Sequence, residues 1–135
     1  MKTVLVVDDS RSARMIFIRC LKIVGFSGAE FIEAANGCEA LERIAGRSDV
    51  ELALIDLNMP TMDGYALAEA LRARPEHAGM RLIVASSLVN EAVRERLLAT
   101  GADAVLEKPI SPVTLVGALS APLGRRADGA IDRLG

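Results

Sequence analysis

Short runs of apolar, largely β-branched residues alternate along the chain with longer segments whose apolar residues recur every three or four positions. The short runs are typical of strands buried on both faces, and the longer segments are typical of amphipathic helices. The pattern predicts five strands, at 3–7, 30–33, 51–56, 81–85 and 104–107, and five helices, at 13–24, 40–45, 65–73, 90–98 and from 112 onward. Gly25 is expected to end the first helix, Asn36-Gly37 to form a turn, and Asn90 and Ser111 to cap the last two helices. Strict alternation of the two kinds of element favours an α/β fold: a doubly wound parallel sheet, (βα)5, with helices on both faces.

Composition narrows the class of protein. With 135 residues, of which 51% are apolar and 25% charged, the chain has the balance of one globular domain. A net charge of −2 and only 3% aromatic residues disfavour nucleic acid as a partner. No apolar run approaches the roughly 18 residues that a membrane span requires, so no membrane insertion is expected. Cys20 and Cys38 form no CxxC motif and no signal peptide is recognised, which favours free thiols and a cytoplasmic location.

Polar side chains follow four of the five predicted strands. The first strand is followed by Asp8 and Asp9, the third ends in Asp56, and the fourth and fifth are followed by Ser86 and Lys108. Ligands of doubly wound sheets bind beyond the carboxyl ends of the strands. These five side chains are therefore expected to converge on one site.

Three carboxylates and one ammonium group at one site have a chemical consequence. Two like charges about 4 Å apart repel by about 4 kcal/mol at an effective dielectric constant of 20, so the cluster favours a bound cation. Oxygen ligands in a shallow site suit Mg²⁺ better than Ca²⁺. A carboxylate nucleophile, a divalent ion, a hydroxyl group and a lysine are together typical of proteins that handle phosphoryl groups.

In these residues the chain resembles the receiver domains of response regulators, the phospho-acceptor half of two-component signalling. The matching residues, in family order and spacing, are Asp8-Asp9, Asp56, Ser86 and Lys108-Pro109. The strings after the acceptor look most like those of chemotaxis-type, single-domain receivers: Asn58-Met59-Pro60 and Met62-Asp63-Gly64. The match covers residues 3 to about 120. It implies a flavodoxin-like strand order, 2-1-3-4-5, with a receiver domain over 1–120 and a short tail, 121–135, without an output domain.

The resemblance implies a role for each matching residue. Asp56 would accept a phosphoryl group from a histidine kinase or phosphotransfer protein, and Lys108 would pair with Asp56 and then with a phosphoryl oxygen. The ligands implied for Mg²⁺ are Asp9, Asp56 and the backbone carbonyl of Asn58, with Asp8 acting through water. The resemblance also implies a cis peptide bond between Lys108 and the proline that follows it.

The implied output is a change in protein binding. Ser86 would turn toward the phosphoryl group and draw its loop along, so that a local change of charge biases a two-state switch. A downstream protein would dock on the face formed by helix 90–98, strand 104–107 and the last helix. The resemblance thus describes a stand-alone switch, monomeric or weakly dimeric, that is not a turnover enzyme.

Some positions depart from the family's usual pattern or stand outside it. Val105 lies where the family usually has Tyr or Phe, and no nearby aromatic residue is expected to replace it, so the output face should be read differently. Leu88 lies where many relatives have a polar residue, close to the path of an attacking water, and can alter the rate of hydrolysis. His77, the only histidine, follows Pro75 in a predicted loop and is expected at the surface.

The same strand-end residues leave three other interpretations of the site to consider. A haloacid-dehalogenase-type phosphatase also uses a strand-end aspartate and Mg²⁺, but needs a general acid/base where this chain has Asn58. A flavodoxin-like flavin protein would place a phosphate where Asp8 and Asp9 repel it, and aromatic residues to flank the flavin are scarce. A degenerate receiver would dock without phosphorylation, although all the acceptor-site residues are present.

Overall fold

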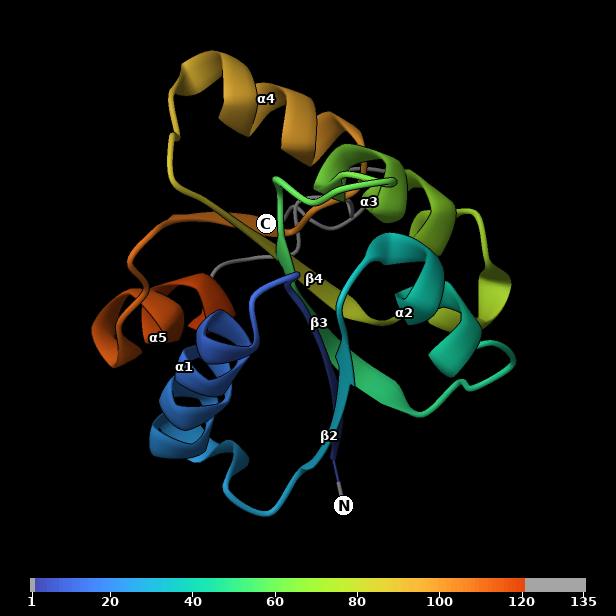
Figure 1. Cartoon of the computed structure of the whole chain (residues 1–135), viewed down its shortest axis with the longest axis horizontal. Coiled ribbons are helices and arrows are strands. Elements are labelled where there is room, and N and C mark those ends of the chain that lie inside the picture. Colours follow the sequence, from blue (N-terminus) through green and yellow to red (C-terminus); the bar gives the residue numbers. More distant parts are fainter. Residues whose placement is uncertain (1, 121–135) are drawn as a thin grey trace.

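A computed structural model describes residues 2–120. A single five-stranded sheet lies at the centre of the molecule, with helices around it (Figure 1). The strands are β1 (Thr3–Val7), β2 (Glu30–Ala34), β3 (Val50–Asp56), β4 (Arg81–Ser86) and β5 (Ala104–Glu107). They lie in the order β2-β1-β3-β4-β5, and every pairing is parallel. The predicted doubly wound fold and its strand order are confirmed, and each predicted strand is correct to within one residue at either end. The predicted tail, 121–135, lies outside the described residues.

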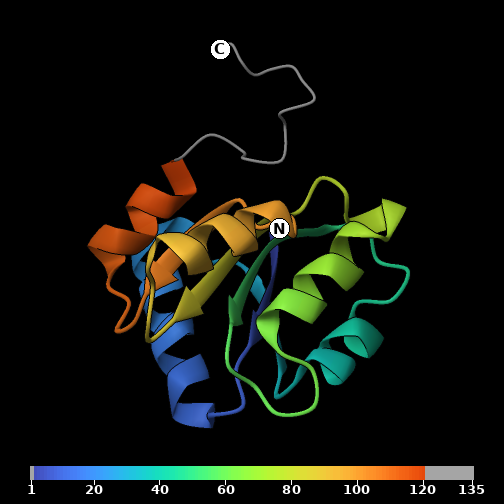
Figure 2. The ribbon, with the colours of Figure 1, turned by 90° about the horizontal axis from the view of Figure 1, so that it is seen from above.

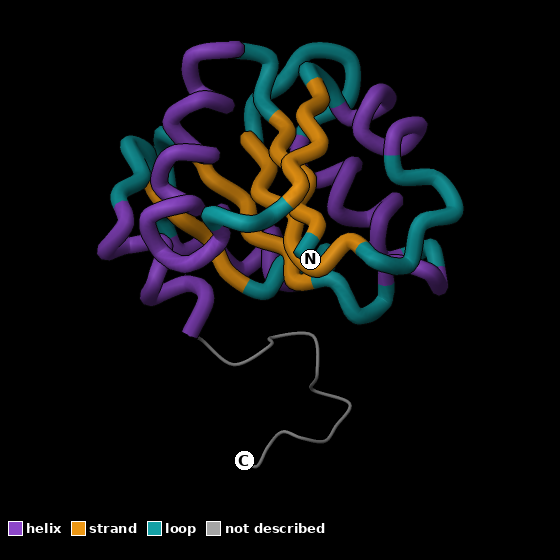
Figure 3. The backbone as a smooth tube through the Cα atoms, turned by 90° about the horizontal axis from the view of Figure 1, so that it is seen from below, coloured by secondary structure: helices purple, strands orange, loops and turns teal. Residues whose placement is uncertain are grey.

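Within residues 2–120, five α-helices cover the sheet: α1 (Arg11–Leu21), α2 (Gly37–Arg43), α3 (Gly64–Arg72), α4 (Glu91–Ala99) and α5 (Pro112–Ser120). α1 and α5 pack together on one face, and α2 and α3 pack together on the other, where α4 also lies (Figures 1 and 2). Figure 3 shows the strands enclosed between these helices. None of the helices in the described part of the chain is long and apolar enough to cross a membrane.

The central strands have continuous apolar runs because both faces of the sheet are covered. On β1, Val4 and Val6 belong to the core beneath α1 and α5. The alternate residues Leu5 and Val7 belong to the core beneath α2 and α3. Successive side chains of a strand point to opposite faces, so each residue of the run is buried on one face or the other. Polar residues are thereby restricted to the strand ends.

Polar side chains begin all five α-helices of the described part of the chain. Each N-cap side chain accepts a hydrogen bond from the backbone N–H three residues on, and these caps are Ser10, Asn36, Asp63, Asn90 and Ser111. Asn90 is the cap predicted for α4. Asn36, predicted to form a turn with the following glycine, instead begins α2, which therefore starts and ends earlier than predicted.

The end of the first helix differs in kind from the prediction. Its α-helical part stops at Leu21, and the chain continues as a wider, π-helical turn over Lys22–Phe26. Gly25 within this turn has a φ of 126°, in the left-handed region that favours glycine. The predicted end of the helix at this glycine is therefore correct, although the hydrogen-bond pattern leading to it is not the predicted one.

His77 contradicts the expectation from the sequence, because its side chain is buried. It closes a short 3₁₀ turn, Pro75–His77, between α3 and β4, and its backbone carbonyl accepts a hydrogen bond from the guanidinium of Arg72. Burial lowers the pKa of the imidazole. Neither ring nitrogen has a hydrogen-bond partner among the described residues. The surface prediction is wrong because the turn directs this side chain inward, which its position after a proline does not reveal.

Candidate functional site

Three aspartates meet at the carboxyl edge of the sheet. Val7 of β1 and Ile55 of β3 are paired in register, so Asp8 and Asp56 leave the two strands side by side. Both are buried, whereas Asp9, the next residue of the loop, is exposed. One carboxylate oxygen from each aspartate lies within 4.8 Å of the other two. The carboxylates predicted from the strand ends are therefore brought together, near the point where the strand order reverses.

Lys108 links two of these carboxylates. Its Nζ lies 2.8 Å from Oδ1 of Asp56 and donates a hydrogen bond to Oδ2 of Asp8 at 3.1 Å. The backbone N–H of Lys108 donates to the carbonyl oxygen of Ser86 at 2.8 Å, which ties the end of β5 to the end of β4. The Lys108–Pro109 peptide bond is cis, as expected. One ammonium group shared by two aspartates balances part of the negative charge of the cluster.

Burial and pairing both affect the titration of Asp56 and Lys108. Burial raises the pKa of the Asp56 carboxyl, and although the hydrogen bond from Lys108 opposes this effect, the nearby charge of Asp8 adds to it. Burial lowers the pKa of Lys108, but its hydrogen bonds to Asp56 and Asp8 outweigh burial and leave that pKa above its usual value. Lys108 is therefore charged, and the ionised form of Asp56 is disfavoured relative to an aspartate in water.

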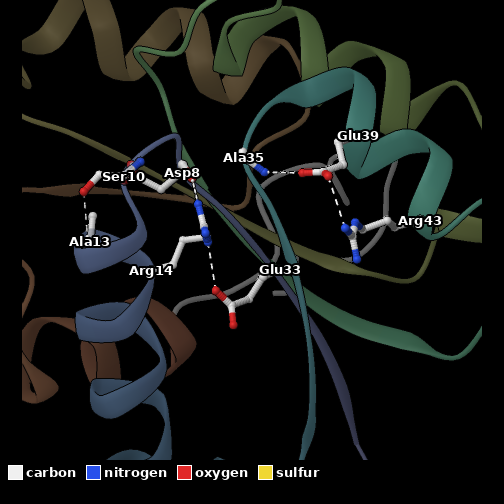
Figure 4. A network of polar contacts seen from close by, with 8 residues as sticks. All are labelled: Asp8, Ser10, Ala13, Arg14, Glu33, Ala35, Glu39 and Arg43. Atoms are coloured by element: carbon white, nitrogen blue, oxygen red, sulfur yellow. Dashed lines mark hydrogen bonds and ion pairs between the residues drawn. The ribbon is translucent and has the colours of Figure 1, made fainter.

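Asp8 is held from several sides (Figure 4). Its Oδ1 accepts a hydrogen bond from the N–H of Ser10 at 2.9 Å, and its backbone carbonyl accepts one from the guanidinium of Arg14 at 2.6 Å. Arg14 also pairs with the Glu33 carboxylate of β2 at 2.8 Å. A role for Arg14 was not predicted from the sequence. The sequence offers only one indication of it, which is a positively charged residue early in the helix that follows the acidic pair. These contacts hold the loop between β1 and α1 in one arrangement.

The hydroxyl group of Ser86 faces its own loop. Ser86 is the last residue of β4 and is buried. Its Oγ donates a hydrogen bond to the carbonyl oxygen of Leu88 at 3.0 Å and accepts one from the N–H of Leu88 at 3.3 Å. The single proton of the hydroxyl is thus engaged within the loop, and a turn toward Asp56 requires the loop to release it.

The loop after Asp56 leads directly into α3. The backbone N–H of Asn58 donates to the Asp56 carboxylate, and the Asn58 side chain is exposed. At the end of the loop, the N–H of Gly64 donates to the carbonyl oxygen of Leu57 at 2.7 Å. A Cβ on Gly64 would lie 2.8 Å from the Leu57 Cα, so only glycine allows this close approach. The acceptor is therefore followed by a compact loop that is bonded to the end of its own strand.

The fold and the site together define a class of protein, and comparison with known proteins agrees. Residues 4–120 match the family described as response regulator receiver domain, and the chain belongs to this family. A chemotaxis protein CheY homolog of Campylobacter jejuni is 32% identical over 120 residues, which cover 89% of this chain and 91% of that protein. The solved structure of the chemotaxis response regulator CheY4 of Vibrio cholerae has a TM-score of 0.77 at 30% identity, covering 88% of this chain and 96% of that one. The resemblance inferred from the site residues is confirmed.

Other similar proteins are longer. The sensor histidine kinase CheAY of Helicobacter pylori is 35% identical over 109 residues, which are 80% of this chain but 13% of that protein. The transcriptional regulatory protein PrrA of Mycobacterium bovis is 36% identical over 127 residues, which are 94% of this chain and 52% of that protein. The chain thus spans about half or less of the length of these relatives. Receiver domains generally bind Mg²⁺ through acidic residues, and the all-oxygen cluster of Asp8, Asp9 and Asp56 fits that ion.

Proposed function

We propose that this chain is a stand-alone response regulator that accepts a phosphoryl group on Asp56 from a histidine kinase or phosphotransfer protein. The observation that carries the proposal is the acceptor itself: a buried carboxylate 2.8 Å from the Lys108 ammonium, inside a cluster of three aspartates. This arrangement combines a nucleophile, a fixed positive charge and oxygen donors for a cation. The protein acts as a cytoplasmic binding switch and not as a turnover enzyme.

In the proposed transfer, a carboxylate oxygen of Asp56 attacks the phosphorus of a phosphohistidine. The O–P bond forms as the N–P bond breaks, and the donor imidazole keeps the electron pair of the broken bond. Lys108 then pairs with a phosphoryl oxygen, and its positive charge remains at the site because its pKa is raised. The hydroxyl of Ser86 breaks its hydrogen bond to the Leu88 carbonyl and donates a hydrogen bond to a phosphoryl oxygen instead.

The acidic cluster is the proposed holder of Mg²⁺, which when bound would neutralise charge on the transferred phosphoryl oxygens. The proposed ligands are Asp9, Asp56 and the backbone carbonyl of Asn58, with Asp8 acting through water. Asp9 is exposed and its neighbour Asp8 is buried, so the cluster is reached from the solvent side. The Ser10 N–H and Lys108 bind the two oxygens of Asp8, which keeps this carboxylate in place.

Intact-mass spectrometry after incubation with Mg²⁺ and acetyl phosphate tests the proposal. We expect the wild-type protein to gain one labile phosphate and the Asp56→Asn variant to gain none, because the amide keeps the shape of the side chain but is not a nucleophile. Asp63→Asn is the matched control: it changes an exposed aspartate that caps α3, and it should gain phosphate as the wild type does. No gain by the wild type, or equal gain by Asp56→Asn, would contradict the assignment of Asp56.

The same measurement separates the alternatives. A degenerate receiver that docks without phosphorylation would gain no phosphate in any variant. An aspartate-dependent phosphatase would hydrolyse the donor repeatedly, but the general acid/base it needs is replaced by the amide of Asn58. The acceptor geometry around Asp56 and Lys108 therefore favours the switch over both alternatives.

We further propose that a downstream protein docks on the face formed by α4, β5 and α5. The large apolar side chains exposed there include Leu98 of α4 and Val113 and Val116 of α5, with Val113 81% exposed. α5 carries no charged residue, so a partner could cover it without desolvating a charge. The protein itself is proposed to be a monomer or a weak dimer.

A further inference from the structure

Val105 packs in a small apolar cluster between the sheet and α4, and this cluster includes an aromatic ring. Its buried members are Leu57, Val84, Leu97, Ala102 and Val105, and the residues packed against them are Tyr65, Val89 and Val93. An aromatic ring thus packs against the cluster that contains Val105, although β5 itself supplies none. The ring comes from α3 and not from β5, which spacing along the sequence does not reveal.

A cation from α4 lies over this ring. The Cζ of Arg96 is 3.7 Å from the centroid of the Tyr65 ring, well within the range of a cation–π contact. Tyr65 is partly buried in the first turn of α3, whereas Arg96 is exposed. Tyr65 directly follows Gly64, whose N–H bonds to Leu57 and closes the acceptor loop. The stack therefore joins α4 to the loop that follows Asp56.

The helix that carries Arg96, α4, contributes few buried side chains to the core. Leu97 is the one buried side chain of α4. By comparison, α1 has three buried side chains: Phe17, Cys20 and Leu21. Arg96 directly precedes Leu97, so the stack and the buried leucine hold the same turn of α4. Loss of the stack should weaken the attachment of α4 without opening the apolar core.

The start of α4 is connected to Ser86. The Ser86 hydroxyl bonds to Leu88, and Asn90 caps the helix two residues further along. In the proposed switch, the Ser86 hydroxyl breaks its hydrogen bond to Leu88 and bonds to the phosphoryl group. This change of partner displaces the loop and the beginning of α4. The contact with Tyr65 opposes that displacement, because Tyr65 belongs to α3 and remains next to the acceptor loop.

We infer that Tyr65 and Arg96 are positioning residues of the switch, whose stack holds α4 in the arrangement in which Ser86 bonds to Leu88. The inference rests on the proposed function. A contact present in one of two states stabilises that state, so its removal shifts the balance toward the other state. The size of an exposed cation–π contact corresponds to a change in affinity of about two- to fivefold. Loss of the stack should therefore strengthen the binding of a phosphoryl mimic at Asp56.

Titration with beryllofluoride in the presence of Mg²⁺ tests the inference, with the bound mimic measured by ¹⁹F NMR. We expect Arg96→Ala to bind beryllofluoride about two- to fivefold more tightly than the wild type. Arg96→Lys retains a cation and should return the affinity toward the wild-type value. Arg94→Ala, the matched control, removes the same charge from another exposed position on α4 and should leave the affinity unchanged.

Tyr65 supplies an independent spectroscopic measurement, because it is the only tyrosine and the chain has no tryptophan. The fluorescence emission of the wild type and of Arg94→Ala should change as beryllofluoride saturates the site. In Arg96→Ala the change should be much smaller, because the stack is absent from the start. A purely structural role for Arg96 would not produce this pattern together with tighter binding.

Two kinds of result would overturn the inference. If Arg96→Ala binds beryllofluoride as weakly as the wild type or more weakly, or if wild-type emission is unchanged at saturation, the stack does not restrain the switch and the proposed function still stands. If the wild type binds no beryllofluoride, both the inference and the proposed function fail. Arg96 is exposed, so its substitution should leave the fold intact, and thermal denaturation of each variant checks this.

Discussion

The two sides of the acceptor site are held in different ways. On the β1 side, the carboxylate oxygens of Asp8 are bound by the Ser10 N–H and by Lys108, and its carbonyl is bound by Arg14. On the β4 side, the hydroxyl of Ser86 bonds only to Leu88, within its own loop. The side chain and carbonyl of Asp8 are thus bonded to several elements. The hydroxyl of Ser86 is bonded within its own loop, and the Ser86 contact with another element is made by its backbone carbonyl, which accepts from the Lys108 N–H.

The helices that follow these two strands also differ in how many side chains they bury in the core. α1 contributes three buried side chains to the core and α4 contributes one. A segment with few buried apolar contacts opens at a lower free-energy cost than one with many. The β1–α1 side is therefore suited to keeping the carboxylates in position. The β4–α4 side is suited to changing its conformation when a charged phosphoryl group is added to Asp56.

Core truncations should damage the two sides unequally. Phe17→Ala, in α1, is expected to lower the free energy of unfolding by about 3–5 kcal/mol. Leu97→Ala, in α4, should cost only about 2 kcal/mol, because its partly exposed neighbours can collapse into the space. Urea denaturation measures both values, with Met15→Ala and Leu98→Ala as controls at exposed positions of the same helices. An equal or greater loss in Leu97→Ala would contradict the proposed difference between the helices.

The conformational change caused by a phosphoryl mimic should be restricted to the β4–α4 side and should not reach full conversion to the second state. A shift of a two-state balance from 1:99 to 99:1 needs roughly 5.5 kcal/mol, whereas one charge-assisted hydrogen bond from Ser86 supplies on the order of 1.5–3 kcal/mol. Amide chemical shifts with beryllofluoride should therefore change mainly over residues 86–100 and little around Val105. Ser86→Ala should lose most of this response, at a cost in stability of about 1 kcal/mol. Large, saturating changes along all of β5 would show that the response is not confined to the β4–α4 side.

Removal of the acceptor charge should stabilise the fold at neutral pH. The pKa of Asp56 is raised in the folded state, so its ionised form is unfavourable there. This penalty is lost as the pH falls through the folded pKa toward the unfolded value of about 4. Asp56→Asn should therefore raise the free energy of unfolding by about 1 kcal/mol at pH 7 without Mg²⁺, and the gain should shrink as the pH is lowered. Thermal denaturation at several pH values measures this gain. An unchanged melting temperature at pH 7, or a gain that grows at low pH, would count against it.

Much of the fold and most of the candidate site could be predicted from the sequence. The five strands are found because a residue buried on both faces of a sheet must belong to an apolar run. Asp8, Asp56 and Lys108 are found because they follow such runs and because parallel strands end at a common edge. Asn90 is found because its side chain can accept the hydrogen bond that begins a helix.

The residues that were missed or misplaced are those whose surroundings depend on how the chain turns and packs, which local spacing does not indicate. Arg14 binds the Asp8 carbonyl and Glu33 across the β1–β2 edge, which no local motif indicates. His77 is buried because a 3₁₀ turn directs it inward, although the turn itself looks like an ordinary loop. Tyr65 reaches the cluster of Val105 from α3, so a search for an aromatic residue along β5 could not find it.

The sequence by itself determined the order of strands and helices along the chain and the set of polar residues at the strand ends, because burial periodicity and position in a strand are local properties. Only the tertiary structure decided which of the long side chains meet. Lys108 binds Asp8 in addition to the Asp56 partner that the resemblance implies, and Arg96 lies over Tyr65, because the packing of separate elements sets the direction and reach of each side chain. Those contacts depend on how the helices and strands pack, which spacing along the chain does not specify.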